Sequence, residues 1–307
     1  MRIPSPSLAL PSCILLFLLA LGPAALAQVT VLLPDQPTRE EDPRDKERQM
    51  DVLLALIEPF AHVALPLDMP QRLAVVRAVP PAPRAAATPR EGERPAQAPP
   101  PPFVATSEEL LGDCEEIRYL GEKSWATHVA LNTPGLYTLL AETRPRFDAE
   151  RQTFQQDFVK TILPVFGVQE GWYAPVGLHF EIVPQTRPFG LMAPAVFNGR
   201  VLVANAPLPN ATVTLARLNT NARGVPTHWH ERHVARTNAA GEFSLACPLD
   251  GWWCLYASTL MPTPLKGPDN TDKPLEIRAI LWVYVDTPGN TTHKPTRPHK
   301  PKGAKNK

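Results

Sequence analysis

Apolar and polar residues alternate in short segments along most of this chain, with turn-forming residues between the segments. The segments include SWATHVAL, LYTLLAE, VKTILPV, GLHFEIVP, GRVLVANAPLPNATVTLARL, RHVARTNAAGEFSLACPLDGWWCLYAS and LEIRAILWVYV. Alternation with a period of two is typical of β-strands that bury one face. Strands spaced about 8–12 residues apart, without a long amphipathic helix, predict an all-β fold of the sandwich type.

The same pattern predicts how the chain is organised. The apolar run MDVLLALIEPF indicates a buried strand that ends near Pro59, because proline cannot continue a strand ladder. The length of the chain suggests two β-sandwich domains, residues 28–187 and 188–286. Residues 79–102 are rich in proline and alanine and predict a semi-rigid linker inserted in the first domain.

The first residues indicate a signal peptide. Arg2 supplies a basic start, Ile14 to Leu21 form a short apolar run, and small residues follow at Ala25 and Ala27. We expect cleavage after Ala27, which removes residues 1–27 and leaves Gln28 first. No later segment is long and apolar enough to span a membrane, so the mature chain is expected to be exported without a membrane span.

Charge and motifs narrow the function classes. The net charge is +1, which indicates neither nucleic acid nor an anionic membrane as a partner. Residues 287–307 carry the surplus of basic residues and several prolines, and they predict a disordered tail. The chain lacks a G-x-S-x-G elbow, a phosphate-binding glycine loop and an H-E-x-x-H motif, so we predict that it is not an enzyme and uses no organic cofactor.

Three of the eight histidines lie within six residues, in the stretch VPTHWHERHVART. On an extended strand His228 and His230 would face the same side, and His233 would join them through a turn or bulge. Glu231 would add an oxygen donor. Imidazoles with a carboxylate suit nickel, copper or zinc, so these four residues are the predicted metal ligands. The alternative is a solvated hairpin that binds nothing.

Three further pairs of residues each allow more than one interpretation. His179 and Glu181 share a strand face, and a surface pair explains them better than a site. Cys247 and Cys254 flank a tight turn, which allows a disulfide as well as two buried thiols. Trp252 and Trp253 alternate faces, so one ring should enter the core.

Two stretches carry a family resemblance. GRVLVANAPLPNATVTL with ARTNAAGEFSLACPLDGWWCLYA resembles the transthyretin-like or carboxypeptidase-regulatory-like sandwich. ILPVFGVQEGWYAPVGLHFEIVPQTRPFG (Ile162 to Gly190) with FSLACPLDGWW resembles a bacterial periplasmic family of otherwise unknown function. Its members are extracytoplasmic components of nickel and cobalt uptake systems of the energy-coupling-factor ABC type. The resemblance covers residues 104–285 well and residues 29–76 weakly.

This resemblance implies a periplasmic accessory or binding component of nickel or cobalt uptake, which captures or presents the ion or docks to the permease subunits. Two departures count against a metal site in the first domain: the mature chain starts Gln28-Val29-Thr30 where relatives begin near a histidine, and Glu58-Pro59-Phe60 replaces His-Pro-Phe. The alternative is a structural or protein-interaction module that binds no metal. A hydrolase of the transthyretin-like kind is a weaker third possibility.

Overall fold

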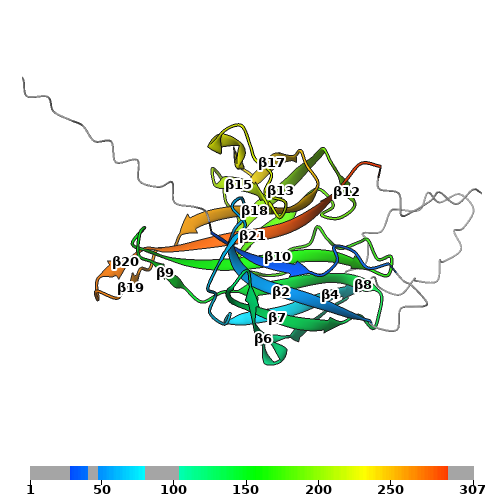
Figure 1. Cartoon of the computed structure of the whole chain (residues 1–307), viewed down its shortest axis with the longest axis horizontal. Coiled ribbons are helices and arrows are strands. Elements are labelled where there is room, and N and C mark those ends of the chain that lie inside the picture. Colours follow the sequence, from blue (N-terminus) through cyan, green and yellow to red (C-terminus); the bar gives the residue numbers. More distant parts are fainter. Residues whose placement is uncertain (1–27, 41–47, 80–103, 290–307) are drawn as a thin grey trace, which may run out of the picture.

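The computed structural model describes residues 28–40, 48–79 and 104–289 of the chain (Figure 1). Within these ranges the regular structure is β-strand, apart from the 3-10 helices η1 (Leu111–Asp113) and η2 (His228–His230). The prediction of an all-β sandwich fold is therefore confirmed. The predicted signal peptide, residues 80–102 of the predicted linker and residues 290–307 of the predicted tail lie outside the described residues.

The strands form three layers, which we name the first, central and third sheets. The first sheet has the order β1-β2-β7-β6, with β3 paired to β2. All its neighbouring strands are antiparallel. Its strands are β1 (Val29–Pro34), β2 (Gln49–Glu58), β3 (Val63–Leu65), β6 (Glu115–Tyr119) and β7 (Glu122–Ala130).

The central sheet has the order β16-β15-β18-β21-β10-β8-β4-β5, with β9 paired to β10 and β12 paired to β21. In its middle β10 runs parallel to β21, with Phe154 opposite Leu275 and Thr161 opposite Trp282. Its strands are β4 (Arg72–Val79), β5 (Val104–Glu109), β8 (Gly135–Glu142), β9 (Arg146–Asp148), β10 (Thr153–Val165), β12 (Leu191–Met192), β15 (Thr212–Arg217), β16 (Arg232–Arg236), β18 (Gly251–Leu260) and β21 (Leu275–Asp286).

The third sheet is smaller and covers the opposite face of the central sheet. Figure 1 shows β13 and β17 on one side of β10 and β21, with β2 and β7 on the other. Within it β13 pairs with β11, β14 and β17. Its strands are β11 (Phe180–Pro184), β13 (Ala195–Val203), β14 (Ala206–Pro207) and β17 (Glu242–Cys247), and a separate hairpin joins β19 (Leu265–Lys266) to β20 (Asp272–Lys273).

Two apolar cores lie between these layers, and the central sheet contributes to both. Successive residues of a strand point to opposite faces. On β21, Leu281 therefore packs in the core against the third sheet, while Trp282 packs in the core against the first sheet. Both side chains are almost completely buried. A strand buried on both faces has a continuous apolar sequence, which explains the run AILWVYV in β21.

The predicted domain boundary at residues 187 and 188 does not separate two units in the structure. Strand β10 comes from the first predicted range and β21 from the second, yet they are neighbours in one sheet. Strand β11 also lies in the first range but pairs with β13 of the second. The two predicted sandwiches therefore share the central sheet, and neither range has a core of its own.

The turn around Gly241 joins β16 of the central sheet to β17 of the third sheet. Gly241 has φ of +74°, and a Cβ there would lie 2.8 Å from the Val201 carbonyl oxygen, so a side chain would clash with the neighbouring backbone. Phe243 then fills the core against the central sheet.

Trp253 is buried and Trp252 is partly buried, in agreement with the predicted alternation.

Candidate functional site

The histidine cluster lies in the loop between β15 and β16, at an edge of the central sheet. The buried Asn219 fixes the start of this loop. Its Nδ2 donates to the carbonyl oxygens of Phe60 and Arg223, both at 3.0 Å, and its Oδ1 accepts from Arg223 N at 2.9 Å. Asn219 N also donates to the Pro59 carbonyl. The loop is therefore anchored to the turn between β2 and β3.

The local structure corrects our expectation that His228 and His230 share a strand face. Both residues belong to the 3-10 helix η2, which starts after Thr227. A 3-10 helix has three residues per turn, so residues two apart point in different directions and residues three apart lie above one another. His228 is therefore aligned with Glu231, whose N–H donates to the His228 carbonyl oxygen.

The rings of the cluster have separate surroundings. The His228 ring contacts the Trp229 ring at a tilt of 36°, with ring centroids 4.5 Å apart. His230 Nδ1 lies 2.9 Å from Thr227 Oγ1. His228, Trp229 and His230 are exposed, whereas Glu231 is half-buried. The exposed fraction of Trp229 is 77%.

His233 points elsewhere, because it lies on β16 opposite Leu215. It is half-buried, and its ring centroid is 6.1 Å from that of Trp253, toward the core against the third sheet. In the described part of the chain, no group of three or more His, Cys, Asp or Glu side chains is placed to hold a metal ion. The four predicted ligands thus lie in neighbouring positions but are not assembled into a site.

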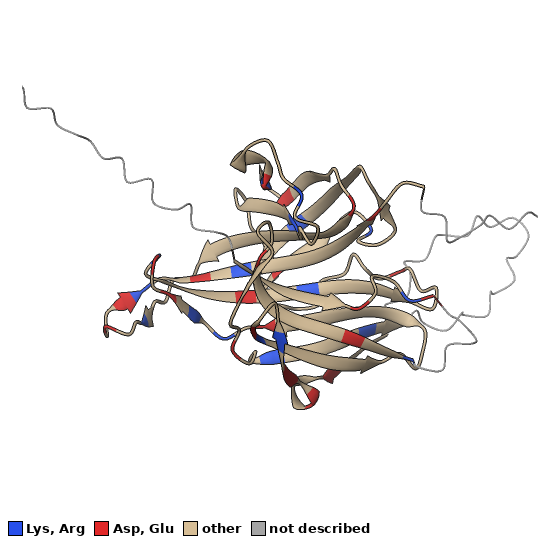
Figure 2. Cartoon of the chain, in the orientation of Figure 1, with Lys and Arg blue, Asp and Glu red and all other residues tan. Residues whose placement is uncertain are grey.

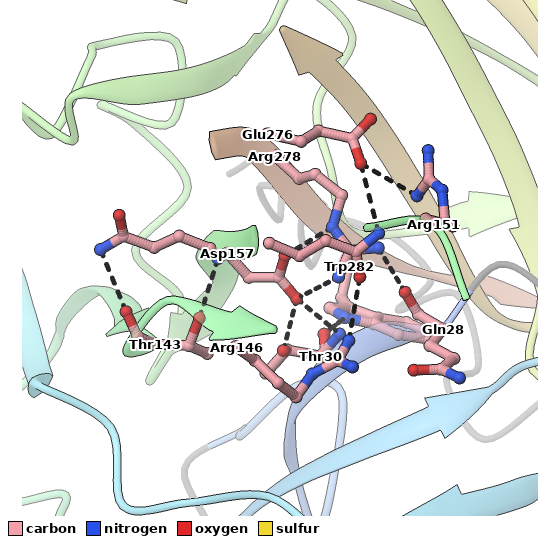
Figure 3. Close-up of polar contacts among 11 residues, drawn as sticks. Gln28, Thr30, Thr143, Arg146, Arg151, Asp157, Glu276, Arg278 and Trp282 are labelled. Carbon is pink, nitrogen blue, oxygen red and sulfur yellow. Dashed lines mark hydrogen bonds and ion pairs between the residues drawn. The ribbon is translucent and has the colours of Figure 1, made fainter. Parts of the chain in front are cut away.

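A buried ion pair joins β10 to β21 beside the start of β1, and the sequence did not indicate it. Arg278 donates from Nε to Asp157 Oδ1 at 2.6 Å and from Nη2 to Oδ2 at 2.8 Å (Figure 3). Asp157 Oδ2 also accepts from Thr30 Oγ1 at 2.6 Å, and Arg278 Nη1 donates to the Gln28 carbonyl. The nearby Asp157 carboxylate raises the pKa of Arg278 against the opposing effect of burial. This network holds the first described residues against the central sheet.

A second buried pair corrects our expectation for His179 and Glu181. His179 is exposed, but Glu181 lies on β11 and is only 1% exposed. Its Oε1 accepts from Lys160 Nζ at 2.5 Å, and the Lys160 side chain is equally buried. Glu181 is therefore part of an internal ion pair and not of a surface pair.

The cysteines among the described residues are free thiols. Cys247 packs in the core against the third sheet and Cys254 in the core against the first sheet, so the central sheet separates them and a disulfide cannot form. Burial raises the pKa of Cys247 to about 12 and raises that of Cys254 well above its usual range. Both thiols are structural.

The charges of the chain are spread over its surface. Figure 2 shows acidic and basic residues interspersed along strands and loops. This distribution agrees with the net charge of +1. Among the described residues, no helix has the length and apolar character needed to cross a bilayer.

Two solved structures show remote similarity to this chain. The D00-D0 domain of intimin aligns with 85% of this chain and all of its own length, at 11% identity and a TM-score of 0.17. The two tandem V-type regions of VCBP3, a v-region-containing chitin binding protein, align with 82% of this chain and 99% of their own length, at 13% identity and a TM-score of 0.21. At such low scores neither likeness bears on function.

Comparison with protein families is more informative. None of the curated proteins matches the chain. The model of the family described as "Domain of unknown function (DUF4198)" matches residues 25–260, which is well over half of the chain. The chain therefore belongs to the DUF4198 family.

Proposed function

We propose that this protein is an exported, non-catalytic binding component of divalent transition-metal uptake, and that the loop with His228, His230, Glu231 and His233 receives nickel or cobalt as cargo. The observation that carries the proposal is a single anchored loop with two exposed imidazoles and a half-buried carboxylate, followed by a third imidazole on β16. The resemblance of residues 162–190 to components of nickel and cobalt uptake supports the same function.

Capture of an ion requires the loop to rearrange. His228 and Glu231 offer the first two donors, because they lie on the same side of η2. His230 or His233 joins them when the loop closes around the ion. Ordering the loop costs part of the binding free energy, so the affinity is expected to be lower than at a preformed site. A cargo site that must release its ion to a permease tolerates such a cost.

One specific observation favours a second function, docking to a protein partner without metal. Trp229 is the most exposed of the large hydrophobic side chains in the described ranges. Tryptophan is strongly enriched among the residues that dominate binding energy in protein interfaces. On this second proposal, Trp229 anchors the loop to a permease subunit or another partner protein, and the histidines only surround it.

Calorimetric titration with nickel, cobalt, zinc and copper ions tests the first function. We expect one ion to bind, and the double variant His228→Ala/His230→Ala to lose at least about tenfold in affinity, or 1.4 kcal/mol. Binding should weaken below about pH 6, because a protonated imidazole cannot coordinate a metal. His128→Ala, which changes an exposed histidine on the first sheet, is the matched control and should bind normally.

The variant Trp229→Ala separates the two functions. If the loop is a metal site, this variant should still bind the ion. If the loop docks to a partner, Trp229→Ala should abolish co-purification with the permease subunits while the histidine variant retains it. Absence of ion binding by the unaltered protein would exclude the metal function.

A further inference from the structure

An open groove with a volume of about 620 Å³ lies along the third sheet, and its lining does not include the histidine loop. Its walls come from the loop before β11, the end of β11, strand β13 and the hairpin from β13 to β14. Sites for small organic ligands commonly enclose about 300–1,000 Å³ and combine aromatic walls with a few fixed polar groups. The aromatic and polar residues that line this groove are Trp172, Tyr173, Gln185, Arg200 and Asn205.

Two aromatic rings form one wall of the groove. Trp172 and Tyr173 are packed edge to face, with centroids 5.4 Å apart and ring planes at 86°. Tyr173 is 46% exposed although it is large and partly apolar. The loop that carries them is bounded by Gly171 and Gly177, whose φ angles of +93° and +85° favour glycine.

The buried Glu181 carboxylate fixes this loop in place. Glu181 Oε1 accepts from Val176 N at 3.0 Å, and Oε2 accepts from Gly177 N at 3.2 Å. The same carboxylate pairs with Lys160 of the central sheet. Burying an ion pair is costly unless its geometry and hydrogen bonds are good, so such a pair gives little net stability. Here it holds the two aromatic rings in a defined position before a ligand arrives, which lowers the entropy cost of binding.

Another part of the lining is polar, and a carboxylate beside the groove balances its charge. Glu242 Oε1 accepts from Gln185 Nε2 and from Arg200 Nη2, both at 2.7 Å. Asn238 Nδ2 donates to the other carboxylate oxygen at 3.1 Å. The charge of Arg200 is thus balanced by Glu242. Arg200 Nε is buried and has no hydrogen-bond partner among the described residues.

We infer that this groove binds a neutral saccharide. A sugar ring has an apolar C–H face that stacks on the Trp172 ring, beside the perpendicular Tyr173 ring, and hydroxyl groups at its edge that meet the amide of Gln185 and the guanidinium of Arg200. The balanced charge of the wall gives no advantage to an anionic ligand such as a phosphate or a uronic acid. A proline-rich peptide also binds aromatic grooves, but it needs few polar contacts beside the rings. The polar lining of Gln185 and Arg200, with Glu242 hydrogen-bonded to both, therefore favours the sugar. This inference is independent of the metal function.

The test uses the full chain and three soluble probes. They are neutral glucose or N-acetylglucosamine oligomers, uronic acid oligomers of the same length, and a proline-rich decapeptide. Binding is followed by calorimetry and by tryptophan fluorescence. We expect at least one neutral oligomer to bind with a dissociation constant below about 1 mM, and the two other probes to bind at least about tenfold more weakly.

Variants locate the binding. Trp172→Ala should weaken it at least about tenfold, whereas Trp172→Phe, which keeps a ring, should lose less. Trp229→Ala removes an exposed tryptophan outside the groove and should leave the affinity for the neutral oligomer unchanged. Thermal melts verify that the variants fold. The inference is overturned if no neutral oligomer binds, if the uronic acid oligomers or the peptide bind better, or if Trp172→Ala binds as tightly as the unaltered protein.

Discussion

Replacing Arg278 with methionine should destabilise the fold strongly, because it leaves the Asp157 carboxylate buried without its cation. The two side chains are 5% and 3% exposed, so water cannot solvate the remaining charge. Removing one partner of a buried ion pair costs about 3–5 kcal/mol. Native domains are stable by only about 5–15 kcal/mol, so the loss is a large share of the total.

Urea denaturation followed by circular dichroism measures this loss directly. The midpoint should fall while the slope of the transition stays the same. In a thermal scan the loss corresponds to roughly 6–20 °C, at about 2–4 °C for each kcal/mol in a chain of this size. Arg151→Met is the matched control, because Arg151 pairs with Glu276 at 3.0 Å but is 44% exposed. It should cost less than about 1 kcal/mol.

The double variant Asp157→Asn/Arg278→Met tests the cause of the loss. Asparagine removes the buried negative charge and can still accept the hydrogen bond from Thr30 Oγ1. We therefore expect the double variant to be more stable than Arg278→Met alone. The reasoning would be refuted if Arg278→Met cost no more than Arg151→Met, or if the second change gave further destabilisation.

Three other predictions follow from the charges and thiols of the described residues. Hydrogen bonds, chiefly from Arg200, lower the pKa of Glu242 from 4.5 to about 2. The ionised Glu242 should therefore stabilise the fold fully above pH 4.5, and this stabilisation should be lost as the pH falls toward 2. In melts recorded between pH 4.5 and pH 2, the difference in stability between Glu242→Gln and the unaltered protein should accordingly disappear. Lys160→Met leaves Glu181 buried without a cation and should cost about 3–5 kcal/mol in urea denaturation, with recovery on adding Glu181→Gln. At pH 8 iodoacetamide should modify the half-buried Cys114 long before Cys247, whose pKa burial raises to about 12, and mass spectrometry should find Cys247 alkylated only after unfolding.

The sequence by itself determined the strands. The alternation in SWATHVAL appears as β7, and the segments around Gly241 appear as β16, β17 and β18. These features are local: the period of two follows from strand geometry, and Gly241 is required by its own φ angle. The cluster of histidines was also visible in the sequence, but its shape was not, because a stretch of six residues does not show whether it is strand or 3-10 helix.

The tertiary structure alone decided which strands are neighbours. Strands β10 and β21 lie side by side although more than 100 residues separate them in sequence. The apolar run in β21 is typical of a strand buried on both faces and could have indicated a central sheet. It could not have identified the partner strand, because many pairings of short apolar strands satisfy the same pattern.

The buried charged residues could not be identified from the sequence either. Asp157 and Lys160 sit in one strand and resemble solvent-facing residues when the sequence is considered alone. Their burial depends on Arg278 and Glu181, which reach them from β21 and β11. A charge can be buried only where folding brings its counter-charge within hydrogen-bonding distance. That distance is fixed by the packing of three sheets, and so the structure, not the sequence pattern, determines which charged residues are internal.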